Sequence, residues 1–203
     1  DETKWKRAAD AAKLLIDTQT QHELMGATAE GVPNTFEDAY KYYRSVFTEP
    51  MNKEVLFARS LMVWTNWTDF DEYLQYGAGG MQGITQKLID AFYLDDGTQA
   101  EEGNPHYDET GFTTGRDQIT LNKLIAKDDY KIDEVYNMYQ NREARFYASV
   151  FFNGRKWESE NAKLNGVVQA ADFMLGGLSG GPGYVPATGV MPYKYVAAED
   201  YKG

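Results

Sequence analysis

The most informative stretch of the chain is Tyr139-Gln-Asn-Arg142-Glu-Ala-Arg145-Phe-Tyr-Ala-Ser-Val-Phe-Phe-Asn153-Gly154. From Arg145 to Phe152 the residue types alternate in the manner of a β-strand. The Asn-Gly pair that follows is a preferred hairpin turn, so a second strand is expected at Arg155-Lys-Trp157. The charged residues Arg142-Glu-x-Arg145 are interpreted as a structural ion-pair network, with an anion-binding clamp as the alternative.

Two helices are predicted on the N-terminal side of this stretch. Apolar residues, many of them alanine, recur at three- and four-residue spacing over residues 3–17, which would let another helix approach closely. Thr35 is a suitable N-cap for a second helix over residues 36–47, which carries aromatic residues on one side. The short apolar run from Val55 to Met62 fits a buried strand.

The remainder of the chain is predicted to be rich in loops. The expected elements are a helix over 83–93, a turn at Asp95-Asp-Gly97, a loop over 97–118, a short helix over 131–140, a long irregular segment over 161–189 and a last strand over Pro192–Val196. Loops of this length are uncommon inside a compact domain, and they are usually functional or ordered by packing on something larger.

Composition excludes several classes of function. The chain has 203 residues, with 20 Lys and Arg against 31 Asp and Glu, and its net charge is −11. Without a basic stripe, such a chain is expected to bind neither nucleic acid nor an anionic membrane surface. The absence of cysteine excludes disulfides, thiolate metal sites and cysteine nucleophiles. The two histidines, His22 and His106, lack metal-ligand spacing, and Gly77-Ala-Gly79-Gly80 lacks the third glycine of a dinucleotide fingerprint, so no cofactor is expected.

The most unusual composition is found between residues 64 and 76, where aromatic and polar side chains share one segment. Aromatic rings stack on the C–H faces of sugars while neighbouring amides and carboxylates bind the hydroxyls. Burial of the same rings beneath the loop is an equally good interpretation. The acidic residues nearby also leave a glycoside hydrolase open as a lesser alternative. The candidate ligand-binding residues are Trp64, Asn66, Trp67, Asp69, Tyr73 and Tyr76.

Three segments, taken together, resemble the SusD/RagB family. The first is Lys4 to Asp17 followed by Asn52-Lys-Glu-Val-Leu-Phe57, and the second is Gly80-Met-Gln-Gly-Ile-Thr-Gln-Lys-Leu-Ile-Asp90 continuing to Asp-Gly97. The third and most specific is the stretch from Tyr139 to Gly154, which is similar to the family's Asn-Arg-Asp/Glu-Pro-Arg-Phe-Tyr-Ala block, with Ala144 in place of proline. The segments occur in the family's order and spacing.

The resemblance implies a surface glycan-binding lipoprotein rather than an enzyme. Members of this family lie on the outer face of an outer membrane and deliver oligosaccharides to a SusC-like TonB-dependent transporter. The implied fold is mainly α, with a tetratricopeptide-like helical scaffold and a loop-rich half that carries short β-hairpins. The lipid-anchored N-terminus of the family is absent from these residues, so the chain is expected to be an internal portion of a longer protein.

The expected organisation is one portion of a SusD-like domain over residues 1–203. Residues 1–50 would end the helical scaffold, and residues 51–203 would form the loop-rich region that faces the ligand. The resemblance supports sugar binding at residues 64–76, and it assigns a structural role to the Asn-Arg-x-x-Arg block. The alternative to a glycan ligand is a protein or peptide held by a helical-repeat scaffold.

Overall fold

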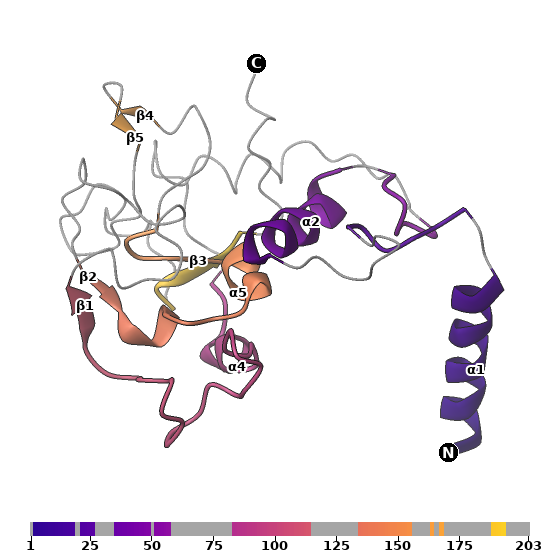
Figure 1. The fold of residues 1–203 in the computed structure, drawn as a ribbon, viewed down its shortest axis with the longest axis horizontal. Helices are drawn as coiled ribbons and strands as arrows, with labels where there is room; N and C mark the ends of the chain where they lie inside the picture. The colour runs from indigo at the N-terminus through magenta and orange to yellow at the C-terminus, as the bar shows by residue number, and fades with distance from the viewer. Residues whose placement is uncertain are drawn as a thin grey trace.

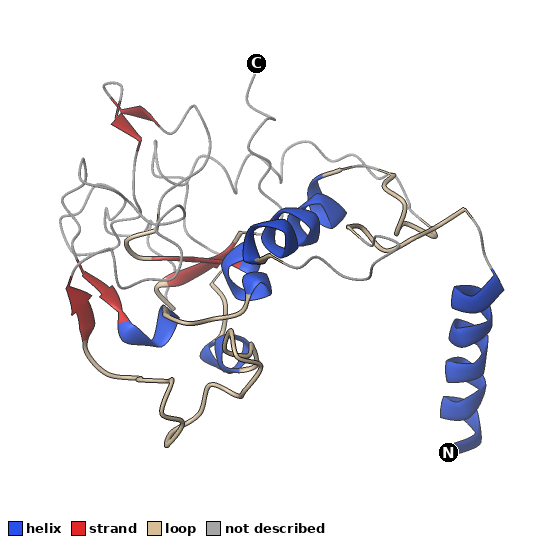
Figure 2. Ribbon diagram, viewed as in Figure 1, coloured by secondary structure: helices blue, strands red, loops and turns tan. Residues whose placement is uncertain are grey.

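The computed structural model describes residues 2–18, 21–26, 35–49, 51–57, 83–114, 134–155, 163–164, 167–168 and 188–193. In this part of the chain, helices are the main regular elements and the strands are short (Figure 2). The helices are α1 (Glu2–Thr18), α2 (Phe36–Thr48), α4 (Gln86–Asp90), the 3₁₀ turn η4 (Asn137–Tyr139) and α5 (Ala144–Ser149). The strands are β1 (Phe112–Thr114), β2 (Glu134–Tyr136), β3 (Val150–Phe152), β4 (Lys163–Leu164), β5 (Val167–Val168) and β6 (Val190–Pro192).

Helix α1 confirms the helix predicted over residues 3–17 and stands apart from the other elements (Figure 1). All of its residues are exposed, including Trp5 and Ile16 from its apolar face. Ion pairs one turn apart, Lys6–Asp10 and Lys13–Asp17, add the modest support that exposed pairs at this spacing provide. None of the helices in the described residues combines the length and apolar character that crossing a bilayer requires.

Helix α2 confirms both the predicted helix and its cap. The backbone N–H of Asp38 donates to Oγ1 of Thr35 at 3.1 Å, which satisfies one of the amides left open at a helix start. The helix lies against α5 (Figure 1), and the ring of Phe36 meets Tyr147 edge-on with centroids 5.8 Å apart. Of the aromatic residues predicted on one side of this helix, Phe36 and Tyr40 pack against the core, whereas Phe47 is exposed and the buried residues of the helix are Arg44 and Ser45.

The stretch from Arg145 to Phe152 is not the single strand that the sequence predicted. Residues 144–149 form α5, which begins where the N–H of Phe146 donates to the carbonyl of Glu143 at 3.0 Å, and only residues 150–152 are extended. The residues of α5 from Phe146 to Ser149 are all buried. Four consecutive buried residues show no amphipathic pattern, so periodicity cannot distinguish such a short helix from a strand.

The turn of the predicted hairpin is confirmed, and Lys156 and Trp157 of its predicted second strand lie outside the described residues. Asn153 and Gly154 do form a turn, in which the N–H of Arg155 donates to the carbonyl of Phe152 at 3.1 Å. The antiparallel partner of β3, however, is β6, with Val150 opposite Pro192 and Phe152 opposite Val190. This last strand also ends at Pro192, where the sequence predicted one to begin; residues 194–196 lie outside the described residues. Local turn chemistry thus predicted the turn, while a long-range contact determined the pairing.

Three further predictions require correction. The helix expected over 83–93 is reduced to Gln86–Asp90, because Tyr93 and Leu94 leave it to form β-bridges with Gln99 and Arg142. The helix expected over 131–140 is instead β2 followed by η4, since residues 134–136 pair with β1. Residues 55–57, the described start of the predicted buried strand, form no strand, and Phe57 is among the most exposed apolar residues.

The predicted turn is confirmed, whereas short strands interrupt the two predicted loops: β1 lies within residues 97–118, and β4 and β5 lie within residues 161–189. Asp95 and Asp96 form the predicted turn, and Gly97 follows with a φ of 81°, in the left-handed region that glycine adopts without strain. Residues 97–111 are loop and lead into β1. Of the segment from 161 to 189, the structure describes the two-stranded pair β4–β5 and the approach to β6.

The core is built from aromatic side chains of α5, β3 and η4. Tyr139 stacks on Phe152 with ring centroids 4.6 Å apart, and Phe92 meets Phe146 edge-on at 5.7 Å. Such offset and edge-on contacts add to the stabilisation that ring burial itself provides, about 2 kcal/mol or more for each fully buried ring. The other buried apolar residues of this cluster are Ile84, Ile89, Val135, Tyr147, Val150 and Val190.

Candidate functional site

A long loop over residues 93–111, between α4 and β1, lies on the outside of this core and carries many exposed polar side chains. Its base is fixed to the segment before α5. The N–H of Asp95 donates to the carbonyl of Asn141 at 2.8 Å, and the N–H of Glu143 donates to the carbonyl of Tyr93 at 3.0 Å. Asn141 adopts a φ of 51°, a left-handed conformation that asparagine tolerates better than most residues. Two backbone hydrogen bonds, at Tyr93 and Asp95, therefore fix the start of the loop to residues 141–143.

Arg142 anchors this assembly from inside. Its side chain is 1% exposed, and its guanidinium donates to the carbonyls of Ile89 and Met138, the latter at 3.4 Å. The same group lies 4.9 Å from the ring centroid of Phe146 and 5.6 Å from that of Tyr107. Burial lowers the pKa of Arg142, and the neighbouring Tyr107 opposes that effect. One side chain thus links the end of α4, η4, the loop and α5.

The predicted ion-pair network is confirmed for Arg145 and wrong for Arg142. Arg145 donates through Nε and Nη2 to the two carboxylate oxygens of Glu143 at 2.8 and 3.0 Å, and this hydrogen bonding raises its pKa. Within the described residues, Arg142 forms no ion pair and is held by carbonyl groups and aromatic faces instead. The block has a structural role, as the sequence suggested, but its buried arginine donates hydrogen bonds to backbone carbonyl oxygens rather than to carboxylates.

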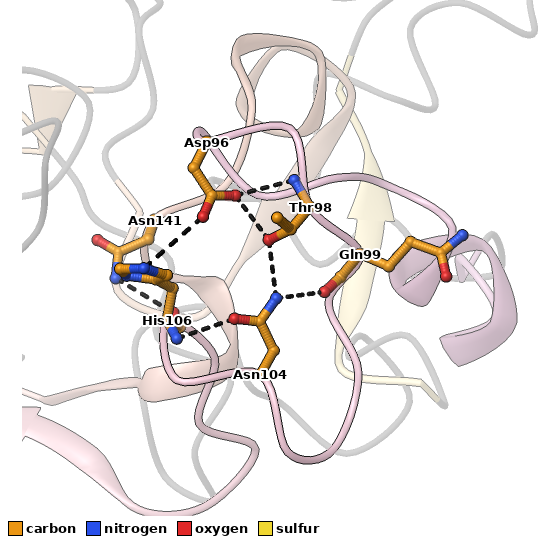
Figure 3. Close-up of polar contacts among 6 residues, drawn as sticks. All are labelled: Asp96, Thr98, Gln99, Asn104, His106 and Asn141. Atoms are coloured by element: carbon orange, nitrogen blue, oxygen red, sulfur yellow. Dashed lines mark hydrogen bonds and ion pairs between the residues drawn. The ribbon is translucent and has the colours of Figure 1, made fainter.

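Six residues of the loop and of the adjacent segment before α5 form what we call the polar cluster (Figure 3); its members are Asp96, Thr98, Gln99, which takes part through its backbone carbonyl, Asn104, His106 and Asn141. Oδ1 of Asp96 accepts hydrogen bonds from N and Oγ1 of Thr98 at 2.8 and 2.6 Å. Asn104 donates to Oγ1 of Thr98 at 2.7 Å and to the carbonyl of Gln99 at 2.8 Å. Nε2 of His106 lies 3.8 Å from Oδ2 of Asp96.

The electrostatics of the polar cluster keep its carboxylate charged. The hydroxyl of Thr98, then its backbone N–H and the proximity of His106, lower the pKa of Asp96. An exposed and oriented carboxylate of this kind accepts hydrogen bonds from hydroxyl groups, as on a sugar. Over the described ranges, no three His, Asp or Glu side chains converge in a way that could hold a metal ion. The charged carboxylate of Asp96 is thus an acceptor for ligand groups that donate hydrogen bonds.

The structure does not test the candidate residues taken from the sequence. Trp64, Asn66, Trp67, Asp69, Tyr73 and Tyr76 all fall between residues 58 and 82, outside the described residues. Their role in ligand binding stays a prediction.

The polar cluster itself was missed by the sequence analysis, although a signal for it exists. Within this loop the pattern Asp-x-Thr occurs at 96–98 and again at 108–110, and in both places the carboxylate accepts hydrogen bonds from N and Oγ1 of the threonine. Aspartate in such patterns commonly bonds to the backbone two residues ahead.

Comparison with known proteins gives a consistent result. The model of the SusD family matches residues 34–203. A SusD-like protein from Bacteroides fragilis NCTC 9343 has a similar structure, with 23% identity and a TM-score of 0.52 over 97% of this chain and 34% of that one. The selenomethionine form of BT4246 is similar as well, with 17% identity and a TM-score of 0.54 over 98% of this chain and 38% of that one. No curated protein matches the chain.

The two structural similarities establish a mainly α, SusD-like fold, which confirms the predicted fold class. The chain covers only 34% and 38% of these two solved chains, so it spans little more than a third of their length.

Proposed function

The chain belongs to the SusD family, and on that premise we propose that it is part of a surface glycan-binding protein that passes oligosaccharides to a TonB-dependent transporter. The proposed location is the outer face of an outer membrane, with attachment through an N-terminal lipid. The proposed role is capture and delivery rather than catalysis. The observation that carries the proposal is the family match, which extends over residues 34–203.

The proposed ligand contacts are the aromatic and polar residues of the segment from 64 to 76. Trp64, Trp67, Tyr73 and Tyr76 would stack on sugar rings, while Asn66 and Asp69 would bind hydroxyl groups. Rigid aromatic side chains lose little conformational freedom on binding, so they provide contact area at low entropic cost. The net charge of −11 favours a neutral glycan over a polyanionic one.

The test is a screen of the full-length protein against an array of neutral and anionic glycans. It is run in parallel with a Trp67→Ala/Tyr73→Ala variant. We expect binding to one class of neutral glycan, and we expect the Kd of the variant to rise by about tenfold or more, since two stacking surfaces are lost. Phe47→Ala, which removes an exposed ring from α2, is the matched control and should bind as the unmodified protein does.

The outcomes separate the parts of the proposal. Glycan binding that the double variant retains would support the function and move the site away from residues 64–76. Failure to bind any glycan would contradict the proposed function and favour the peptide-binding scaffold, which a peptide library would then test. Release of shorter sugars from a bound glycan would instead show a glycoside hydrolase, which needs two carboxyl groups about 5–10 Å apart in one cleft.

A further inference from the structure

A pair of aromatic rings lies exposed where β1 and β2 meet the loop. Phe112 and Tyr136 are directly opposite each other in the antiparallel pair, and their ring centroids are 4.3 Å apart. Phe112 is 45% exposed and Tyr136 is 40% exposed, whereas Val135, on the other face of the ribbon, is buried. Each ring therefore covers part of its neighbour and still offers area to solvent (Figure 1 shows β1 and β2 at the edge of the molecule).

Contacts with the buried core fix the position of this ring pair. The ring of Tyr136 meets Tyr139 edge-on at 6.1 Å, and Tyr139 is itself buried and stacked on Phe152. Next to the pair, the N–H of Asn137 donates to the carbonyl of Gly111 at 3.2 Å and joins the two strand ends. An aromatic surface held in this way is already in place before a ligand arrives, which reduces the entropic cost of binding.

An oriented carboxylate is connected to the pair through Asn137, the residue that follows Tyr136. Oδ1 of Asp108 accepts from N and Oγ1 of Thr110, both at 2.9 Å, and Oδ2 accepts from Nδ2 of Asn137 at 3.1 Å. A carboxylate has about four lone-pair positions, so these three hydrogen bonds leave one open on Oδ2. The bonds from Thr110, backbone first and then hydroxyl, lower the pKa of this exposed group.

Asn137 connects the carboxylate to the rings. It follows Tyr136 in the chain, its Nδ2 also donates to the carbonyl of Thr110 at 2.8 Å, and its Oδ1 accepts from Gln140 at 2.8 Å. Because all of its polar atoms are engaged within the protein, Asn137 sets the position of Asp108 relative to Tyr136. One hydrogen-bonded residue, Asn137, thus separates the carboxylate from the ring-bearing residue Tyr136.

We propose that Phe112, Tyr136 and Asp108 form a second sugar-binding subsite, which takes one neutral pyranose unit of the captured glycan. The C–H face of the sugar lies on the exposed rings, and one hydroxyl donates to Oδ2 of Asp108. Asp108 and the adjacent Glu109 repel a carboxylated or sulfated sugar, which sets the ligand class. A second copy of this chain is a poorer occupant, since a stable contact buries roughly 800 Å² on each partner, far more than two half-exposed rings offer.

This proposal rests on the proposed glycan-binding function, and its test keeps the two apart. The full-length protein is titrated calorimetrically with the neutral glycan that binds best on the array. The variants are Phe112→Ala/Tyr136→Ala, which removes the surface, Phe112→Leu, which keeps apolar volume without a ring, and Asp108→Asn, which replaces the acceptor. Phe47→Ala is the control, because Phe47 is 37% exposed and also lies in a ring pair, with Tyr43 at 5.4 Å.

We expect the double variant to raise Kd about tenfold, and Phe112→Leu and Asp108→Asn to raise it several-fold, with the control unchanged. Unchanged melting temperatures of Phe112→Leu and Asp108→Asn show that any loss of affinity is not a loss of folding. Glycan binding that none of these variants weakens would overturn the subsite and leave the proposed function intact. Absence of glycan binding by the unmodified protein would overturn both, and a dimer that the double variant abolishes would assign the surface to a second copy instead.

Discussion

Replacement of Arg142 tests whether one buried cation holds the loop, α4 and α5 together. Its guanidinium bonds to the carbonyls of Ile89 and Met138 and lies against the rings of Phe146 and Tyr107. We expect Arg142→Ala to lower the free energy of unfolding strongly, because it removes these hydrogen bonds and ring contacts and leaves a cavity.

The magnitude follows from the contacts. A hydrogen bond from a charged group contributes about 1.5–3 kcal/mol, and the bond to Ile89 is the better of the two, since the bond to Met138 is long at 3.4 Å. The loss of packing against two rings adds about 1–2 kcal/mol, so the total for Arg142→Ala is about 3–5 kcal/mol. Arg142→Lys should cost less, about 2–3 kcal/mol, because an ammonium group stays charged but cannot reproduce the planar fork.

Urea unfolding of the full-length protein, followed by circular dichroism, measures these differences. Arg145→Ala is the matched control. Arg145 lies three residues away with a side chain that is 52% exposed, and its ion pair with Glu143 should contribute less than about 1 kcal/mol. Equal effects of the two substitutions, or a loss below about 1 kcal/mol for Arg142→Ala, would refute the reasoning that the buried guanidinium organises this region.

Three further predictions concern single residues. Thr35→Ala should destabilise α2 by about 1 kcal/mol in the same unfolding assay, because the N–H of Asp38 loses its acceptor, whereas Thr35→Ser should be nearly neutral. Burial raises the pKa of Tyr139 to about 12, above its ordinary value of 10.0, so between these pH values only the unfolded chain ionises this phenol. The free energy of unfolding should therefore be constant below pH 10 and fall as the pH rises toward 12. The Tyr139→Phe variant should show a smaller fall. Asn141→Gly should be tolerated, whereas Asn141→Val should lower the free energy of unfolding by about 1–2 kcal/mol, because a β-branched residue is strained at a φ of 51°. Equal melting temperatures for the two variants would contradict this prediction.

The helices that the sequence predicted well are those whose signals are local. The periodic apolar residues of α1 and the cap and aromatic spacing of α2 identified both elements to within a residue or two. The turns at Asp95–Gly97 and Asn153–Gly154 were predicted for the same reason, since each depends on the residues that form it. The family resemblance rested on short segments in a fixed order, and the family match confirms it.

The predictions that were wrong depend on contacts between distant residues. Residues 146–149 are helical because they are enclosed by the core, and residues 134–136 are extended because β1 lies beside them. The candidate binding sites differ in the same respect: one was chosen from the sequence, and the others were found only in the structure. The residues from 64 to 76 were chosen by composition and stay a prediction. The polar cluster and the Phe112–Tyr136 pair instead depend on folding, which brings together residues far apart in the chain, such as His106 and Asn141, 35 residues apart.

The sequence by itself thus determined the mainly α class, the two N-terminal helices, the turns and the family. Only the tertiary structure decided that β3 pairs with β6, that Arg142 is buried among carbonyls rather than carboxylates, and that Asp108 is linked through Asn137 to the exposed ring pair. The physical reason is the range of the interactions. Caps, turns and helical periodicity act within a few residues, whereas strand partners, burial and the grouping of side chains are set by segments that meet only when the chain folds.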